Sequence, residues 1–561
     1  MSRKVTRRSF LRKCTLASLT MAVYPPWRVE AKPRFDVIIK GGIILDGTGG
    51  PTWSADLGIT GDTISAIGSI PSEQGKKVIN GQGLHVCPGF IDIHTHSDGI
   101  ILAYPGAESR VRQGITTELT GNCGDSAAPL LGIDADQRRK EWKEDSGVEA
   151  SWTSVASYFE QLENTGIAIN QALLVGQGTL RRNVMGLVNR QPTSDEMRAL
   201  LYALEESLEQ GAFGLSTGLE YAPGIYSSTE EIVELARVVA RRDGLYASHI
   251  RDEERLLLEA LNEAIEIGRQ SGARVEISHL KASGQPNWNK QEAALALLEA
   301  GRRDGINVLA DAYPYTAFST GLSILLESWV REGGSSAIVK RLRDPEQRAR
   351  IRQEIIDKVS GDLGSFDLMV ISQVQTEKNR SIIGKSITEI GYIWNVEPVD
   401  ALLRLLEEEE TSVSFISHAM SEENVERVLA HPLVMIGSDG WCMAPTGKAA
   451  QSRPHPRSYG AFVRVLNYYV RDKKLFPLAT AIKKMTSMPA TQIGISDRGR
   501  IATGMKADLV VFDAETVQDE ATFEFPHRFP IGIEHVIVNG KIVVESGKQT
   551  MARPGRALRK S

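Results

Sequence analysis

The sequence has little excess charge and few cysteines. Its 65 Lys and Arg residues nearly balance its 70 Asp and Glu residues, giving a formal net charge of −5. Because the charges nearly cancel, the chain has no large excess of one sign of charge that would favour binding to nucleic acid or to an anionic membrane. Four cysteines among 561 residues stand at irregular spacing and give no disulfide framework. With 42% apolar residues the chain can bury a large core, and we expect its partner to be a small molecule.

Long hydrophobic runs are also missing. Beyond the first thirty residues, no segment approaches the roughly 20 apolar residues that a membrane span needs. Near the start, Arg7 and Arg8 stand shortly before the apolar run TLASLTMAV. This order is typical of a twin-arginine export signal. We therefore predict a signal over residues 1–31, export to the periplasm and a mature chain without a membrane span.

Short strand patterns occur at both ends of the mature chain. Residues 35–88 contain FDVIIKGGIILDG and ADLGITGDTISAIG, and residues 496–561 contain ADLVVFD and IEHVIVNGKIVVESG. Alternating apolar residues broken by Gly and Asp predict strands. The two segments can pair with each other, and we predict a small β-sandwich domain built from both termini.

The middle of the chain alternates short apolar runs with amphipathic helices. The run AINQALLVG, for example, precedes TSDEMRALLYALEESLEQG, in which Thr193 and Glu196 form a capping box. Strands that are apolar throughout imply burial on both faces, as in a parallel barrel. We predict an α/β fold, with a TIM-like (β/α)8 barrel over residues 89–315 and 396–495.

The alternation breaks after INVLADAYPY. A charged helix around KRLRDPEQRARIRQEI and the strand-like FDLMVISQV follow, and we interpret residues 316–395 as an insertion after barrel strand seven. The alternation returns with PVDALLRLLEEEE, and LVMIGSD is the expected last strand. The sequence leaves open whether VSFISH is a further strand or a loop.

His94 and His96 end the apolar segment FIDIHTH, which follows the turn PGF. In an extended chain, residues i and i+2 point to the same side, so both imidazoles can reach one ion. A lone histidine is more often a satisfied core or surface residue than a ligand. A pair at the end of a strand favours metal ligation.

Three further candidate ligands end apolar runs. His249 in YASHIRDE and His279 in EISHLKASG are 30 residues apart, the length of one βα unit, so they should lie on adjacent strands. Asp439 in MIGSDG closes the last expected strand with a carboxylate whose burial would be costly without a cation. We expect all three at the carboxyl rim of the barrel.

Cys123 in ELTGNCG ends another apolar run, between glycines that allow close backbone approach. A free cysteine is most often a small buried apolar residue, and Cys87 is interpreted in that way. Because the other candidate ligands also stand at strand ends, Cys123 is interpreted as a metal thiolate. Cys442 has no predicted role.

Together these motifs resemble those of the amidohydrolase superfamily and, within it, the D-aminoacylase (N-acyl-D-amino-acid deacylase) family. The resemblance covers nearly the whole mature chain. It rests on GNCG, STGLEYAPG, SHIRDE, ISHLKASG, DAYPYTAFSTG, GSDG and HPRSYGAFVRVL. The cysteine of GNCG separates this branch from relatives that use a carboxylated lysine.

The resemblance implies zinc as the cofactor. The ligands of a tight zinc would be Cys123, His249 and His279. Those near a second, weaker metal position would be His94, His96 and Asp439. Asp439 would also act in catalysis, because a carboxylate there can take a proton from water and return it to the departing nitrogen.

The resemblance also implies a substrate with a carboxylate. The residues that hold this carboxylate would be Tyr221, Lys281 and Arg457. Those that border the reacting amide would be Tyr313 and Ser319. A guanidinium, an ammonium and a phenol suit a carboxylate chemically. The loop WCMAPTGKAAQSRP is longer than the family pattern, so Arg453 is a rival to Arg457.

The expected reaction is hydrolysis of an N-acyl-D-amino acid to a carboxylate and a free D-amino acid. Two alternatives keep the barrel and change the bond: a cyclic amidase or imidase of the hydantoinase or dihydroorotase kind, and a dipeptidase that releases a D-residue. The carboxylate clamp argues against the cyclic substrates, because a neutral ring does not need it. A non-catalytic metal- or ligand-binding barrel is a third alternative, which the complete ligand set and Asp439 disfavour.

Overall fold

The computed structural model describes residues 34–560, and the predicted export signal lies outside them. A barrel of eight parallel strands forms the centre of the molecule. Its strands, in chain order around the ring, are β6 (Phe90–Asp92), β7 (Ile115–Thr120), β8 (Asn170–Gly176), β9 (Gly214–Gly218), β10 (Leu245–His249), β11 (Arg274–Ile277), β12 (Val308–Ala312) and β16 (Val434–Ile436). The N–H of Asp439 donates to the carbonyl of His94, and that of His96 to Gly440, which links the last strand to the first. The predicted (β/α)8 barrel is confirmed.

Helices cover the outside of the barrel. In α6 (Ser194–Glu209), Thr193 and Glu196 form the predicted capping box, and the leucines at 200, 204 and 208 are buried on one face. The other helices beside the barrel are α2 (Glu108–Val111), α3 (Ala135–Ser146), α4 (Val155–Thr165), α5 (Gln177–Met185), α7 (Thr229–Arg241), α8 (Leu257–Ser271), α9 (Gln291–Arg303), α15 (Glu422–Ala430), α16 (Arg457–Arg464), α17 (Leu478–Met485) and α18 (Ser487–Ile493). Within residues 34–560, no helix is both long and apolar enough to cross a membrane.

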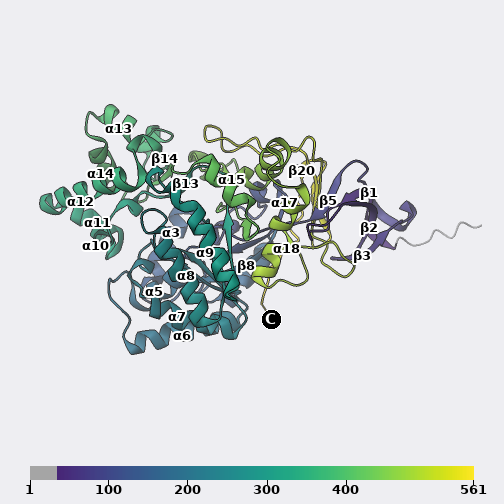
Figure 1. Ribbon diagram of the computed structural model, residues 1–561, viewed down its shortest axis with the longest axis horizontal. Helices are drawn as coiled ribbons and strands as arrows, with labels where there is room; N and C mark the ends of the chain where they lie inside the picture. The colour runs from purple at the N-terminus through teal and green to yellow at the C-terminus, as the bar shows by residue number, and fades with distance from the viewer. Residues whose placement is uncertain (1–33, 561) are drawn as a thin grey trace, which may run out of the picture.

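The two ends of the described chain meet in one nine-stranded mixed sheet, at the opposite end of the molecule from the insertion (Figure 1). Its strands are β1 (Phe35–Ile44), β2 (Trp53–Thr60), β3 (Thr63–Gly68), β4 (Gly75–Asn80), β5 (His85–Pro88), β17 (Leu509–Phe512), β18 (Ile533–Val538), β19 (Lys541–Glu545) and β20 (Lys548–Gln549). The antiparallel pair β5 and β17 joins the segments. The predicted sheet domain from both termini is confirmed.

The insertion follows β12, the seventh barrel strand, as predicted. It contains a three-stranded sheet and helices with a hydrophobic core of their own. Its elements are β13 (Phe318–Gly321), α10 (Ser328–Arg331), α11 (Gly334–Arg343), α12 (Pro345–Lys358), β14 (Met369–Gln373), α13 (Ile387–Trp394), α14 (Pro398–Glu408) and β15 (Ser414–Ser417). It therefore continues beyond residue 395: α14 packs into this core, and VSFISH forms β15, the middle strand of the inserted sheet rather than a barrel strand.

Candidate metal centre and active site

The six predicted metal ligands all lie at the carboxyl rim of the barrel. In order around the rim they are His94 and His96 after β6, Cys123 after β7, His249 at the end of β10, His279 after β11 and Asp439 after β16. Cys123, His279 and Asp439 have positive φ angles of 52°, 38° and 51°. Non-glycine residues seldom adopt this left-handed backbone, and such strain tends to be retained at functional sites.

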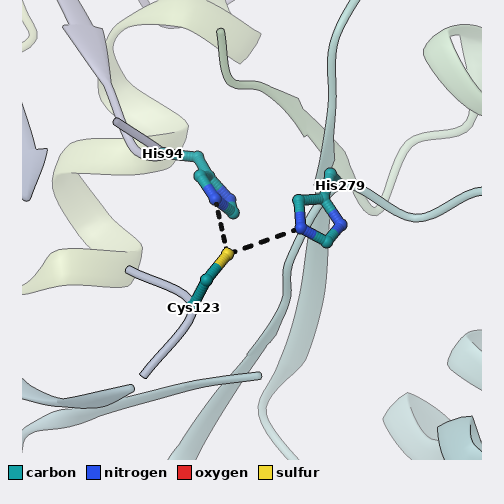
Figure 2. Close-up of side chains that lie close together, drawn as sticks. All are labelled: His94, Cys123 and His279. Atoms are coloured by element: carbon teal, nitrogen blue, oxygen red, sulfur yellow. Dashed lines mark hydrogen bonds between the residues drawn. The ribbon is translucent and has the colours of Figure 1, made fainter. Parts of the chain in front are cut away.

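The thiol of Cys123 lies between two imidazoles. Its Sγ atom is 3.4 Å from His94 Nε2 and 3.5 Å from His279 Nε2 (Figure 2). His279 Nε2 also lies 2.9 Å from His249 Nδ1. The ligand atoms of His94, Cys123 and His279 fall within 4.8 Å of one another. Thiolate and imidazole are the ligands that Zn²⁺ prefers, so the arrangement fits this ion.

A second group of ligand atoms adjoins the first. His96 Nε2 lies 3.0 Å from Asp439 Oδ1, and His94 Nε2 lies 3.6 Å from the same oxygen. These three side chains also place their ligand atoms within 4.8 Å of one another. Because His94 belongs to both groups, two metal positions at this rim would be neighbours.

The charges of the cluster suit a cation. Burial would raise the pKa of the Cys123 thiol, but His94, His249 and His279 outweigh it and hold this pKa well below its usual value. Burial would lower the pKa of His96, yet hydrogen bonds to Asp439 and Cys123 raise it to about 9. A thiolate is therefore available as a ligand, and a metal that binds here displaces protons from the cluster.

A cavity of about 380 Å³ opens onto this centre. Of the predicted residues, its lining includes His96, Cys123, Tyr221, His279, Ser319, Asp439 and Arg457. Arg457 Nη1 lies 2.8 Å from Asp439 Oδ2, and its guanidinium carbon lies 5.0 Å from the centre of the Tyr313 ring. Arg453 does not line the cavity, and its guanidinium donates to the carbonyl of Glu524. The geometry thus favours Arg457 over its rival.

Lys281 and Tyr313 lie behind this cavity rather than in its lining. They border a small space of about 30 Å³, together with Tyr221, Ser319 and Asp439. Lys281 Nζ lies 2.5 Å from Glu253 Oε2, so its charge is already paired. The contact of Lys281 with a substrate carboxylate stays a prediction.

Comparison with known proteins identifies the family. Residues 402–544 match the model of an amidohydrolase family. The chain is 37% identical over 529 residues to the N-acyl-D-glutamate deacylase of Alcaligenes xylosoxydans xylosoxydans, covering 94% of this chain and 97% of the relative. It belongs to the D-aminoacylase family of amidohydrolases.

Two other members of the D-aminoacylase family support the assignment. The D-aminoacylase of Alcaligenes xylosoxydans xylosoxydans is 37% identical over 526 residues, covering 93% of this chain and 97% of that protein. The crystal structure of the N-acyl-D-glutamate deacylase from Bordetella bronchiseptica superimposes with a TM-score of 0.80 at 34% identity, covering 94% of this chain and all of that one. That enzyme was crystallised with zinc and a phosphonate that mimics the tetrahedral intermediate of its reaction.

Sequence reasoning missed three carboxylates that contact the histidines of this D-aminoacylase-family site. The pairs are His94 Nδ1 with Asp311 Oδ2 (3.0 Å), His249 Nε2 with Glu220 Oε2 (3.1 Å) and His279 Nδ1 with Glu253 Oε1 (2.9 Å). All three carboxylates stand inside the quoted motifs DAYPYTAFSTG, STGLEYAPG and SHIRDE. Their position beside strand ends was the available signal. Such carboxylates fix the orientation of a ligand imidazole and raise its basicity.

The change Asp311→Asn tests this orienting role. We expect it to weaken zinc binding at the position that uses His94 about 10–100-fold, because the amide keeps the shape of the side chain and loses the charge beside His94 Nδ1. Competition with a chelator, followed by zinc analysis, measures the change. Unaltered affinity in a folded variant would assign Asp311 to packing alone.

Proposed function

We propose that this protein is a zinc-dependent amidohydrolase that cleaves the amide of N-acyl-D-amino acids, giving a carboxylate and a free D-amino acid. The observation that carries the proposal is the placement of Cys123, the histidine cluster and the Asp439–Arg457 pair at one cavity. Similarity to deacylases of N-acyl-D-amino acids over almost the full chain supports the same reaction. We also propose, from the Arg7–Arg8 motif, that the chain is exported to the periplasm.

The proposed zinc ligands follow the resemblance to the D-aminoacylase family. We assign a tight position to Cys123, His249 and His279: Cys123 Sγ lies 3.5 Å from His279 Nε2, which lies 2.9 Å from His249 Nδ1, and the thiolate is a strong zinc donor. We assign a second, weaker position to His94, His96 and Asp439. When bound, Zn²⁺ lowers the pKa of a coordinated water to about 7 and polarises the substrate carbonyl.

Asp439 is the proposed proton carrier. Burial would raise the pKa of Asp439, but Arg457 and the hydrogen bond with His96 hold it well below its usual value, so the carboxylate is ionised near neutral pH. It takes a proton from the attacking water and gives it to the departing nitrogen, since an amine is a poor leaving group as an anion.

Arg457 is the proposed anchor for the carboxylate of the substrate. Its guanidinium is buried between Asp439 and the Tyr313 ring and donates to the carbonyl of Ser319. A planar guanidinium binds a carboxylate with two parallel hydrogen bonds. Tyr221 and Ser319 line the same cavity, and Tyr313 borders the small space beside it. Tyr221 would help to hold the carboxylate, and Tyr313 and Ser319 would border the reacting amide. Selection of the D-isomer would follow if the anchor and the metal fix two points of the substrate and the pocket accepts the side chain on one side only.

The proposal is tested by release of free amino acid from matched N-acetyl D- and L-amino acids, with the zinc-loaded protein. We expect release from the D-isomers alone. A hydantoin and a dihydropyrimidine serve as cyclic controls and should remain intact. Hydrolysis of the cyclic compounds without release from any N-acetyl-D-amino acid would replace the proposal with a cyclic amidase.

The variant Arg457→Ala tests the anchor. We expect KM to rise by about 10–100-fold, because a hydrogen bond to a charged group contributes roughly 1.5–3 kcal/mol. Arg453→Ala is the matched control, since Arg453 lies outside the cavity lining and should leave KM unchanged. The reverse pattern in steady-state kinetics would transfer the anchor to Arg453.

A further inference from the structure

One fully buried arginine lies outside the lining of the active-site cavity and is not used by the proposed mechanism. Arg110 stands on α2, between β6 and β7, and its side chain has no exposed surface. It pairs with two carboxylates, Asp92 and Glu118, which are equally buried. A buried charge is costly unless opposite charges and hydrogen bonds compensate for it. The partners of Arg110 therefore show which parts of the chain its burial holds in place.

The two carboxylates fix the chain on both sides of the segment HTH, which carries the histidine pair. Arg110 Nη2 donates to Asp92 Oδ2, and Asp92 Oδ1 accepts the N–H of His94 at 3.4 Å. Arg110 Nε donates to Glu118 Oε1, which also accepts the hydroxyl of Ser97 at 3.1 Å. Asp92 stands two residues before the first histidine of the pair, and Ser97 directly follows the second. Arg110 thus holds the segment that carries both imidazoles.

The same guanidinium holds the strand end that carries Asp439. Arg110 Nη2 donates to Ser438 Oγ at 2.7 Å, and this oxygen accepts the N–H of Gly440 at 3.0 Å. A Cβ atom at residue 440 would lie 3.0 Å from Arg110 Nη1, so the guanidinium packs directly against the backbone that follows Asp439. Arg110 Nη1 also donates to the carbonyl of Ser458 at 3.4 Å, which ties the guanidinium to α16. The residues on both sides of Asp439 therefore contact this one side chain.

Asp92 joins the two strand ends directly. Its Oδ1 atom accepts the N–H of Ser438 at 2.9 Å as well as that of His94. Because β6 is the first strand of the ring and β16 the last, this carboxylate and Arg110 bridge them where the ring closes. The spacing between the histidine pair and Asp439 is set at this junction. Proton transfer requires hydrogen-bond distance, so this spacing decides whether Asp439 can act.

We propose that Arg110 is a positioning residue of the reaction, which holds Asp439 in place relative to the histidine pair without touching the substrate. The inference rests on the proposed function and adds to it a residue outside the cavity. A guanidinium suits this task because its N–H groups form a rigid planar fork that meets several acceptors at once. The ammonium of lysine is a single point of charge on a flexible stem and cannot hold the same partners in one geometry.

Arg110→Lys tests the proposal, because it keeps the positive charge and removes the planar fork. With N-acetyl-D-leucine and saturating zinc, we expect kcat to fall about 10–100-fold, since a displacement of about 1 Å caused by a change away from the reacting atoms can cost about 100-fold in rate. Zinc content and thermal unfolding are measured on the same sample. A kcat equal to that of the matched control overturns the proposal.

Arg181→Lys is the matched control. Arg181 is also fully buried, pairs with Glu231 and donates to the hydroxyl of Ser227 and the carbonyl of Arg190. None of these partners adjoins a proposed metal ligand or the proposed anchor. Both variants should lower the temperature of unfolding, whereas only Arg110→Lys should lower kcat.

Ser438→Ala tests the same network without removing a buried charge. It deletes only the hydroxyl that Arg110 and the N–H of Gly440 contact, so we expect kcat to fall by less than in Arg110→Lys. Ser207→Ala is its matched control: Ser207 is buried on α6, donates to the carbonyl of Ala203 and should leave kcat unchanged. If Arg110→Lys does not fold, these two serine variants decide the question, and equal kcat in both overturns the proposal.

A double-mutant cycle distinguishes positioning of Asp439 from a general loss of structure. Adding Arg110→Lys to Asp439→Asn should leave the residual kcat unchanged, because the proton carrier that Arg110 positions is already missing. An equal loss in both backgrounds overturns the positioning inference and leaves the deacylase function in place. Release of no D-leucine by the unmodified, zinc-loaded chain overturns the proposed function itself.

Discussion

Asp439→Asn is expected to lower kcat by about 10²–10⁴-fold at saturating zinc, the range that a positioned acid–base group contributes. The amide keeps the size of the carboxylate but can neither accept a proton from water nor return it to the leaving nitrogen. The left-handed backbone at this position, with φ of 51°, suits asparagine as well as aspartate. The substitution should therefore add no backbone strain, and the loss should arise from chemistry.

The control for this variant is another carboxylate of the same cavity. Asp125 lines the cavity, and its side chain pairs with Arg138 rather than with any of the six proposed ligands. Asp125→Asn should retain most of the turnover. Zinc content and thermal unfolding, measured on both variants, separate lost chemistry from lost metal or lost folding. Turnover near that of the unmodified protein in Asp439→Asn would remove Asp439 from the proton-transfer role.

The barrel was predictable because each of its strands leaves a local signal. Runs such as NQALLVG in β8 are apolar throughout, and the chain is buried on both faces there. The capping box of α6 is equally local, since Thr193 and Glu196 are three residues apart. The end of the insertion was not predictable in this way. An amphipathic helix such as α14 has the same pattern whether it packs on the barrel or on the core of the insertion.

The proposed metal ligands could be predicted from local sequence, whereas the carboxylates that contact them could not. His94 and His96 stand two residues apart, and this spacing alone predicts that their side chains point to the same side of the strand. Asp311 contacts His94 from a strand 217 positions further along the chain. A single carboxylate in DAYPY carries no sign of which imidazole it will meet. Only the closed ring, which brings the strand ends to one rim, makes that pairing visible.

Cys123, which is partly exposed, and Cys442, which is buried, provide a second comparison. Burial raises the pKa of Cys442 well above its usual value, so this thiol stays protonated and is a poor ligand. Cys123 is surrounded by His94, His249 and His279, which lower its pKa despite burial. We therefore expect Cys123→Ser to weaken zinc binding by more than the roughly 10–100-fold expected when a carboxylate that contacts a ligand histidine is replaced. Activity should be lost in parallel.

Zinc per chain after dialysis, together with hydrolysis at increasing zinc, measures the effect of Cys123→Ser. Cys442→Ser is the matched control: it changes the same atom in a buried side chain three residues from Asp439, and it should retain the metal. If high zinc restores turnover in Cys123→Ser, the thiolate acts through metal affinity. If zinc binding is unchanged in Cys123→Ser, the tight position must instead be built from imidazoles and Asp439, and Cys123 is only a neighbour of the metal.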